Sequence, residues 1–234
     1  MNIILFESEQ NSLPLSDNRA KHILEILKLK EGDTFKAGVI NTSEGLATIK
    51  EINGKEILFD YQATSVPVLY PVTMIIAQVR PICMKRILRE AVSLGCSKII
   101  LTTSDTGEKS YANSNIYKSG DYIDYLLDGA MQSAHAGVPE VMFAENASKA
   151  IALAPSTATH ILLDNAVGST PLSSATVTAP AVLAIGPERG WSDREREIFI
   201  SNGYLPMLLG NRVLRTETAC STGLAILLSR LNLL

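Results

Sequence analysis

The apolar positions from residue 72 onward alternate between short, continuously apolar runs and longer stretches with helical spacing. The runs predict buried strands, and the stretches predict helices with one apolar face. The expected strands are Val72–Val79, Lys98–Thr102, Val141–Phe143, Ile161–Leu163, Ala181–Ile185 and Tyr204–Leu208. The expected helices are Lys85–Leu94, Asn115–Ala134, Ala147–Leu153 capped by Asn146, a helix that begins at Ser192, and a last helix through Ala219–Leu231. Strands and helices in alternation are typical of an α/β domain with a mainly parallel sheet.

Residues 1–66 show a different pattern, in which short strands are separated by turn signals. Strands are expected at Ile3–Glu7, Thr34–Ala37, Leu46–Ile52 and Ile57–Ala63, with a helix from Ser16 to Leu27. Asn53-Gly54 is a strong signal for a two-residue hairpin turn. Short strands at this spacing predict a small β-barrel, and the two prolines of Ser65–Pro71 predict an extended linker. We therefore expect two domains, residues 1–66 and residues 72–234.

Composition and charge narrow the class of protein. With 46% hydrophobic and 19% charged residues, the chain of 234 residues is expected to fold around a substantial core. The cysteines Cys83, Cys96 and Cys220 are widely spaced and the histidines are isolated, so neither disulfides nor a metal site are expected. No apolar run reaches the roughly 18 residues of a membrane span, and the first residues carry no basic segment of a secretory signal. A cytoplasmic location without a membrane partner is therefore expected.

Two loops in the C-terminal half each follow an apolar run and precede a helix. They are Gly186–Ser192 and Leu209–Arg215. Ser192 and Glu195 have the spacing of a capping box, and Thr216 is expected to cap the last helix. Helix N-termini expose N–H groups, and ligands bind at the carboxyl ends of parallel strands. The pair of loops predicts a site for a polar cofactor, although ordinary turns with glycines for backbone reasons would show the same pattern.

The sequences of the two loops together resemble those of a known family. Ile-Gly-Pro-Glu-Arg-Gly-Trp-Ser at 185–192, followed by Leu-Gly-Asn-Arg-Val-Leu-Arg-Thr-Glu-Thr-Ala at 209–219, resembles the bacterial 16S ribosomal RNA uridine-N3 methyltransferase family, small-subunit methyltransferase E. That family belongs to the SPOUT superfamily. The resemblance implies S-adenosylmethionine (SAM) as cofactor, a trefoil-knotted α/β domain, a homodimer, and 16S ribosomal RNA or the small ribosomal subunit as substrate.

A second resemblance to the same family lies in the first domain. The segment 22–33 resembles the family motif His-Leu-x-x-Val-Leu-Arg-x-x-x-Gly-Asp, which there belongs to a PUA-like RNA-binding barrel. Lys28 stands where the family has arginine, which keeps the charge but loses the bidentate fork. The residues expected to contact RNA are His22, Lys28, Lys85, Arg86, Arg89, Gln132, Arg189 and Arg212. Alternatively, His22 is a structural histidine, and Lys85 and Arg89 belong to a solvated helix face.

The chain also departs from the family pattern at several arginine positions. Residues 2–6 lack an early arginine, and Ser104–Tyr111 offers only Lys109 where an Arg-Ser pair is expected. His135 replaces another arginine, whereas Arg189 stands in place of a glycine. A formal net charge of −3 adds no basic character to the whole chain. A different RNA such as tRNA, or a non-catalytic role in RNA binding or ribosome assembly, therefore stays open.

The resemblance also implies roles for residues of the two loops. The residues expected to bind the cofactor are Leu163, Ile185, Gly186, Pro187, Glu188, Gly190, Leu209, Gly210, Val213, Leu214 and Thr218. Methylation of uridine at N3 requires loss of an imide proton that is held at neutral pH. We expect Arg215 to be the cation that stabilises the resulting anion, and Glu217 or Glu188 to be the base or the orienting group. Glu217 as an acid that only stabilises the helix dipole is the alternative.

Overall fold

The structure is a computed structural model that describes residues 2–234. Contacts along the backbone divide the chain into two compact units. The first unit contains residues 2–68 together with residues 127–138, and the second contains residues 69–126 and 139–234. The division after residue 68 lies in the expected linker. The grouping of residues 127–138 with the first unit has no counterpart in the pattern of the sequence.

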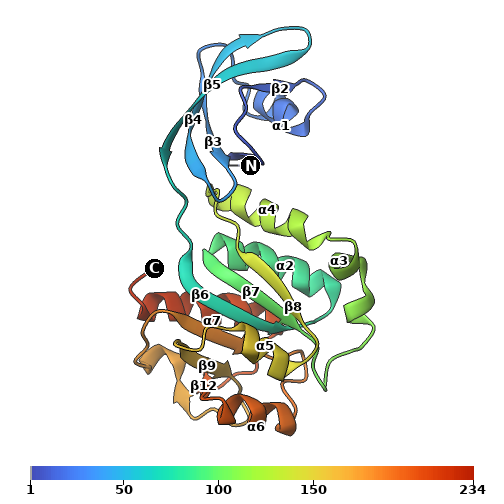
Figure 1. Ribbon diagram of the computed structural model, residues 1–234, viewed down its shortest axis with the longest axis vertical. Coiled ribbons are helices and arrows are strands. Elements are labelled where there is room, and N and C mark those ends of the chain that lie inside the picture. The colour runs from blue at the N-terminus through green and yellow to red at the C-terminus, as the bar shows by residue number, and fades with distance from the viewer. Residues whose placement is uncertain (1) are drawn as a thin grey trace. The chain divides into compact units, whose positions relative to one another are not determined.

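The first unit is built on a curled five-stranded sheet with the order β1-β3-β4-β5-β2 (Figure 1). Its strands are β1 (Ile4–Phe6), β2 (Ser12–Pro14), β3 (Thr34–Val39), β4 (Ser43–Ile52) and β5 (Glu56–Ser65). β1 pairs with β3 in parallel, and the other described pairs are antiparallel. The rings of Phe6 and Phe59 stack in the core with centroids 5.6 Å apart. The four expected strands are confirmed, and the short strand β2 is an addition.

The helix of the first unit differs from the expected one. α1 (Asn18–Lys21) is only four residues long, and a π-helical turn over His22–Ile26 continues it. The Asp17 carboxylate caps α1 by accepting a hydrogen bond from the Arg19 backbone N–H at 2.8 Å. Lys28 then takes a φ of 56°, in the left-handed region, which a regular helix does not accommodate. The uniform apolar spacing therefore predicted a longer regular helix than the chain forms.

The second unit is built on a seven-stranded sheet with the order β10-β12-β9-β11-β6-β7-β8. Its strands are β6 (Tyr70–Ala77), β7 (Cys96–Thr102), β8 (Glu140–Ala144), β9 (Thr159–Leu163), β10 (Thr170–Pro171), β11 (Ala181–Ile185) and β12 (Leu205–Leu208). Every described pair of neighbouring strands in it is parallel. The mainly parallel α/β sheet expected from the sequence is confirmed.

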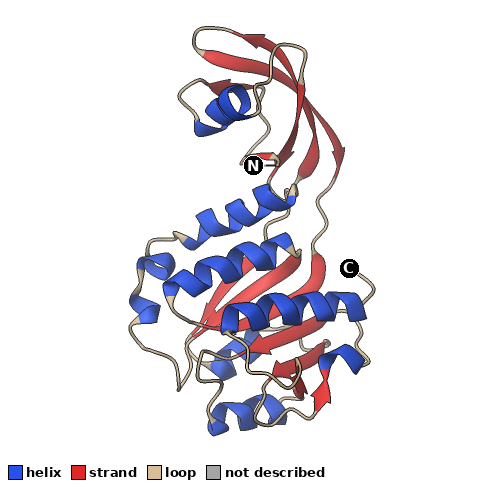
Figure 2. Ribbon diagram, turned by 180° about the vertical axis from the view of Figure 1, so that it is seen from behind, coloured by secondary structure: helices blue, strands red, loops and turns tan. Residues whose placement is uncertain are grey.

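Helices lie on both faces of this sheet (Figure 2). The helices that follow the linker are α2 (Pro81–Ser93), α3 (Asn115–Lys118), α4 (Tyr122–Ser133), α5 (Ala147–Leu153), α6 (Asp193–Ser201) and α7 (Thr216–Arg230). The single helix expected over Asn115–Ala134 is wrong, because Gly120 adopts a φ of 81° and separates α3 from α4. Between residues 2 and 234, none of these helices combines the length and the apolar character that a membrane span requires.

Burial of both sheet faces explains the continuously apolar runs. Val182 packs with Phe199 of α6 on one face, and the adjacent Leu183 points to the opposite face. Gly223 of α7 lies against that opposite face, where an added Cβ would come within 2.6 Å of Leu163 Cδ1 and 3.3 Å of Leu183 Cδ2. The missing side chain of Gly223 thus lets α7 approach the carboxyl ends of β9 and β11 closely.

Candidate functional site

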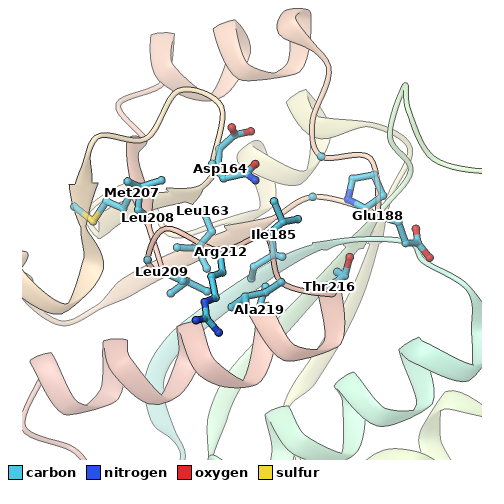
Figure 3. A pocket seen from close by; sticks show the side chains of 17 residues that line it. Leu163, Asp164, Ile185, Glu188, Met207, Leu208, Leu209, Arg212, Thr216 and Ala219 are labelled. Atoms are coloured by element: carbon cyan, nitrogen blue, oxygen red, sulfur yellow. The ribbon is translucent and has the colours of Figure 1, made fainter.

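The loops after β11 and β12 line one cavity, although β9 lies between these two strands in the sheet. This loop cavity has a volume of about 110 Å³ and lies at the carboxyl ends of β9, β11 and β12 (Figure 3). Its lining comes from those strand ends, the two loops and the start of α7. The lining residues are Leu163, Asp164, Asn165, Ile185, Gly186, Pro187, Glu188, Gly190, Met207, Leu208, Leu209, Gly210, Arg212, Val213, Leu214, Thr216 and Ala219.

The first loop is a tight turn that leads directly into a capped helix. The Gly190 N–H donates to the Pro187 carbonyl at 2.8 Å, and Gly190 has a φ of 71° that favours glycine. A Cβ on Gly186 would lie only 3.0 Å from the Trp191 backbone nitrogen. Ser192 and Glu195 then form the expected capping box at the start of α6. The two glycines therefore allow the turn to be tight, and the capping box fixes its end.

The second loop enters its helix without a side-chain cap. The N-cap of α7 is Arg215, which makes no capping hydrogen bond, so the expectation that Thr216 caps this helix is wrong. Thr216 is instead the first residue of the helix and is buried. Val213 in the middle of the loop is 81% exposed. The N–H groups of the first turn of α7 are thus open to a partner outside the helix.

A second cavity shares a wall with the first and is lined by three arginines. This arginine cavity has a volume of about 610 Å³. Its lining residues are Arg80, Cys83, Thr106, Gly107, Glu108, Tyr111, Glu188, Arg189, Val213, Leu214, Arg215, Thr216 and Glu217. The three expected catalytic residues, Arg215, Glu217 and Glu188, all line it. Glu188, Val213, Leu214 and Thr216 line both cavities.

Arg80 is a member of the arginine cavity that the site predictions did not include. It precedes α2, and its backbone N–H donates to Glu188 Oε1 at 3.3 Å. A side-chain hydrogen bond with Tyr111 raises the pKa of the Arg80 guanidinium further above its usual range. Burial, followed by the charge of Glu217 and a hydrogen bond with it, raises the pKa of the Cys83 thiol. The Cys83 thiol is therefore uncharged where it lines this cavity.

Most of the expected cofactor residues lie where the two loops meet. Leu163, Ile185, Gly186, Pro187, Glu188, Gly190, Leu209, Gly210, Val213 and Leu214 line the loop cavity. Thr218 is exposed and is not among the lining residues. Thr216 and Ala219 take that place because positions three apart share a face of α7, whereas Thr218 points to another side. A helical register counted from the observed start at Thr216 would have identified them.

The sequence analysis also missed Asp164, a buried carboxylate in the loop cavity. Asp164 Oδ2 accepts from Arg196 Nε at 2.8 Å, and Oδ1 accepts from the Ala166 backbone N–H at 2.8 Å. Its charge is thus compensated by the protein itself. Its position directly after β9 is the signal that would have found it, because this is the strand end between β11 and β12.

The residues expected to contact RNA are dispersed. Arg189 lines the arginine cavity and Arg212 lines the loop cavity. Lys85 and Arg89 lie over the Tyr125 ring at 4.9 Å and 5.1 Å from its centroid, which is a cation–π arrangement outside both cavities. Arg86 is exposed on the same helix. His22, Lys28 and Gln132 belong to the first unit.

The arrangement is suited to transfer of a group between two bound molecules. The loop cavity offers backbone groups and apolar side chains such as Leu163, Leu209 and Ala219, which fit a flat heterocycle with a polar tail. The arginine cavity offers fixed positive charge next to carboxylates. Within residues 2–234, no group of three or more His, Cys, Asp or Glu side chains has the arrangement of a metal site. The residues that line the two cavities can stabilise charge, transfer a proton and position a ligand.

Comparison with protein families identifies both units. The model of an RNA methyltransferase domain matches residues 66–228, and the model of an RNA methyltransferase PUA domain matches residues 15–60. Two solved structures share the fold. A methyltransferase of Legionella pneumophila in complex with SAM has a TM-score of 0.79 and 24% identity, over 97% of each chain. The ribosomal RNA small subunit methyltransferase E of Neisseria gonorrhoeae, bound to SAM, has a TM-score of 0.80 and 20% identity, over 99% of this chain and 98% of that one.

Relatives with higher sequence identity carry the same name. The chain is 34% identical to the ribosomal RNA small subunit methyltransferase E of Treponema pallidum, over 98% of this chain and 91% of that protein. It is 31% identical to the ribosomal RNA small subunit methyltransferase E 1 of Borreliella burgdorferi, over 98% of this chain and 97% of that protein. The chain belongs to the RNA methyltransferase family, in the group of ribosomal RNA small subunit methyltransferases E.

Proposed function

We propose that this protein is a SAM-dependent methyltransferase that methylates N3 of a uridine in 16S ribosomal RNA. The observation that carries this proposal is the wall of four residues that the loop cavity and the arginine cavity share. SAM fits the loop cavity, and the acceptor base fits the arginine cavity beside it. The names of the relatives support ribosomal RNA as the substrate, and the SAM-bound structural neighbours support SAM as the cofactor.

SAM, when bound, supplies a methyl group that is activated towards nucleophiles. The protein has to hold the acceptor in line with that methyl group and to make its nitrogen nucleophilic. The N3–H of uridine is an imide proton, and its loss leaves negative charge on N3, O2 and O4. Arg215 lines the arginine cavity and carries no capping role, so its guanidinium is available to stabilise that charge.

Glu188 fits the role of the base better than Glu217. Glu188 lines both cavities, whereas Glu217 lines only the arginine cavity. Its Oε1 accepts from the Arg80 N–H at 3.3 Å, which orients the carboxylate. In the proposed step the N3 proton passes to Glu188, the N3–carbon bond forms and the sulfur–methyl bond breaks. Glu217 then acts in the first turn of α7, where a carboxylate stabilises the helix dipole.

The same assignment extends to partners. We propose a homodimer, as the resemblance implies, and a ribosomal substrate in the cytoplasm. Arg189 supports a contact with RNA, because its side chain adds a cation to the acceptor side of the first loop. The PUA-type match over residues 15–60 supports a further RNA contact by the first unit. The second candidate is another RNA, such as tRNA, since Arg189 stands where the family has a glycine.

Mass spectrometry of nucleosides tests this proposal. Ribosomal RNA and tRNA are isolated from a strain that lacks the gene, and from the same strain after complementation with the wild-type gene. The expected result is a 3-methyluridine that is missing from the 16S RNA of the deletion strain and restored by complementation. Loss of a methylated nucleoside from tRNA would favour the second candidate. An unchanged set of methylated nucleosides, together with no binding of SAM in calorimetry, would overturn the enzymatic proposal.

A further inference from the structure

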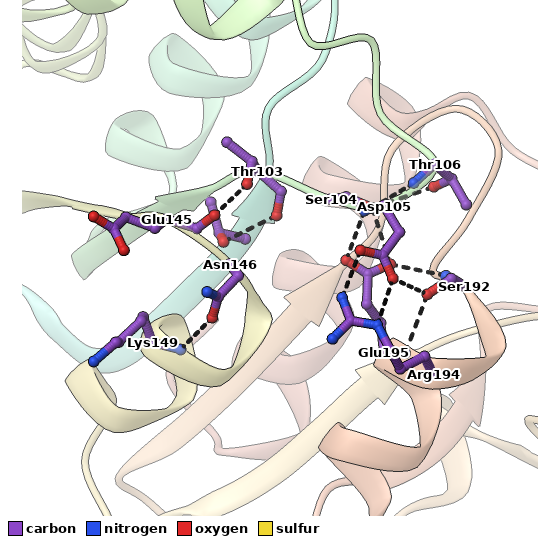
Figure 4. A network of polar contacts seen from close by, with 11 residues as sticks. Thr103, Ser104, Asp105, Thr106, Glu145, Asn146, Lys149, Ser192, Arg194 and Glu195 are labelled. Atoms are coloured by element: carbon purple, nitrogen blue, oxygen red, sulfur yellow. Dashed lines mark hydrogen bonds and ion pairs between the residues drawn. The ribbon is translucent and has the colours of Figure 1, made fainter.

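Six side chains join the loop after β7 to the start of α6 (Figure 4). These residues, named the polar clamp, come from segments about 85 to 90 positions apart in the sequence. The members are Ser104, Asp105, Thr106, Ser192, Arg194 and Glu195. They lie outside the residues that the resemblance assigns to the cofactor or to catalysis.

Glu195 is the centre of the polar clamp. Its side chain is only 2% exposed, yet the carboxylate accepts three hydrogen bonds. Oε1 accepts from the Asp105 backbone N–H at 3.0 Å, and Oε2 accepts from Ser104 Oγ at 3.0 Å and from the Ser192 backbone N–H at 2.8 Å. A buried carboxylate persists only with such donors, so these hydrogen bonds fix the geometry of both segments. The capping box explains the bond to Ser192 but not the two bonds to the other loop.

The side chains of Asp105 and Thr106 make the outer contacts of the clamp. The Asp105 carboxylate accepts from Ser192 Oγ at 2.6 Å and from Arg194 Nη2 at 2.6 Å. The hydrogen bond from Arg194, followed by that from Ser192, lowers the pKa of Asp105, so this carboxylate stays charged at neutral pH. Thr106 Oγ1 donates to the Gly190 carbonyl at 2.5 Å. The loop after β7 is therefore bonded both to the first loop and to the helix that follows it.

The clamp connects the walls of the two cavities. Gly190, which accepts from Thr106, lines the loop cavity. Thr106 itself lines the arginine cavity, together with Gly107 and Tyr111 from the same segment. Among the described residues that line the loop cavity, none belongs to the segment 104–111. Any effect of a ligand in the loop cavity on that segment therefore has to pass through the protein.

We propose that Glu195 is a positioning residue that couples the cofactor loop to the acceptor side of the arginine cavity. Occupation of the loop cavity by SAM further restrains the first loop, which the protein already holds, and the polar clamp passes this restraint to the segment 104–111. Tyr111 in that segment lines the arginine cavity together with Arg80, so the coupling reaches the acceptor site. This inference rests on the proposed function for the identity of the two ligands.

Hydrogen–deuterium exchange on the full-length protein tests the coupling without RNA. In the wild-type protein, saturating SAM should slow exchange in the peptide that covers residues 103–109 by about threefold or more. In Glu195→Gln this slowing should disappear, because an amide offers one acceptor oxygen where the carboxylate offers two. The double variant Ser104→Ala/Thr106→Val removes the hydrogen bonds that Ser104 donates to Glu195 and Thr106 donates to Gly190. It leaves the capping box of α6 intact. It should give the same result.

A matched control separates coupling from a loss of stability. Thr159→Val removes the hydrogen bond that Thr159 Oγ1 donates to the Thr178 carbonyl at 2.9 Å, at the opposite end of β9 from the loop cavity, and should lower Tm without changing the response to SAM. Methyl transfer to small ribosomal subunits from a deletion strain provides a second measurement. Glu195→Gln and the double variant should lower kcat/KM for the subunits by about tenfold or more, with the Kd of SAM changed by less than about threefold.

The outcomes are distinguishable. The coupling is overturned if SAM binds the variants and slows exchange at 103–109 as in the wild type. It is also overturned if Thr159→Val loses transfer to the same extent at an equal loss of Tm. A wild-type protein that binds SAM but methylates another atom or another RNA would contradict the proposed function, while the exchange measurement would still decide the coupling. A wild-type protein that does not bind SAM would overturn both.

Discussion

The two loops of the site enter their helices in different ways. Each leads from the carboxyl end of a parallel strand into a helix, and each lines the loop cavity. The first loop ends in a complete capping box and is bonded to the polar clamp. The second loop ends at Arg215 without a side-chain cap, and its Val213 is 81% exposed. The first loop is therefore held by other parts of the protein, whereas the second loop leaves its backbone N–H groups and the Arg215 guanidinium available to a ligand.

This difference indicates that the two loops have separate roles in the reaction. A loop whose backbone is fixed before binding loses little conformational entropy when a cofactor binds to it. An uncapped helix start with an arginine keeps its N–H groups and its guanidinium available for charge that develops during the reaction. We therefore expect changes in the first loop to affect cofactor binding, and changes in the second loop to affect methyl transfer.

Arg215→Ala should produce the largest effect. The truncated residue cannot stabilise the uridine anion, so the single-turnover rate of methyl transfer should fall by about 10³-fold. The Kd of SAM should stay within about threefold of the wild-type value, because Arg215 lines only the arginine cavity. Single-turnover transfer from radiolabelled SAM to small ribosomal subunits, with calorimetry of SAM, measures both quantities. Transfer at the wild-type rate would contradict the role of Arg215.

Gly186→Ala should act on binding instead. The new Cβ would lie 3.0 Å from the Trp191 nitrogen and 3.1 Å from the Gly190 carbonyl carbon, so the backbone of the first loop has to move. We expect the affinity for SAM to fall by about tenfold or more in calorimetry. Gly54→Ala is the matched control, because a Cβ at Gly54 meets nothing within 4 Å. Equal SAM affinity in both variants would show that the fixed shape of the first loop is unimportant.

The sequence predicted the two loops well because their signals are local. The apolar run of β11, the capping box at Ser192 and the glycines of the turn all act within a few residues of each other. The start of α7 was misplaced by one position, because Thr216 is a good N-cap by type and only the tertiary structure buries it instead. Thr218 was expected in the loop cavity from the resemblance, whereas the register of α7 from Thr216 places Ala219 there instead.

The acceptor side could not be predicted in the same way. Arg80 and Tyr111 are separated by helix α2, strand β7 and the loop after it, and only the fold brings them to one cavity. The grouping of residues 127–138 with the first unit is likewise a long-range effect. Periodicity reports which face of an element is buried, but it carries no information on which distant segment lies against that face.

Arg80→Ala tests whether the arginine that precedes α2 contributes to the acceptor side. Loss of the guanidinium removes a cation from the arginine cavity, and the Tyr111 hydroxyl loses its partner. We expect KM for the small subunit to rise about tenfold, with little change in the Kd of SAM. Arg230→Ala is the control, because Arg230 donates to the Ala175 carbonyl and lines neither cavity. An equal rise in KM for Arg230→Ala would indicate a general charge effect.

Ser192→Ala should lower stability more than it lowers activity. It removes the side chain that accepts from the Glu195 N–H at 3.2 Å, and with it the cap of α6. The free energy of unfolding should fall by about 1 kcal/mol, as measured by urea denaturation. Thr218→Ala on the second loop's helix is the comparison, since Thr218 is exposed and has no capping role, and its stability should be unchanged. Equal stability of the two variants would contradict the picture of a held first loop.

The smallest effect concerns the outer contact of the first loop at low pH. The hydrogen bonds from Arg194 and Ser192 lower the pKa of Asp105 below its ordinary value of 3.8. A carboxylate with a lowered pKa stabilises the folded state at every pH above its unfolded pKa, and this contribution is lost as the pH falls through the folded pKa.

The difference in Tm between the wild type and Asp105→Asn should therefore be constant from neutral pH to about pH 5 and should shrink only in stronger acid. It should also be small, because Arg194 and Asp105 are partly exposed and salt screens their attraction. A difference that already vanishes near neutral pH would mean that Asp105 is not held in its charged form, and the first loop would then depend on the contacts of Glu195 and Thr106.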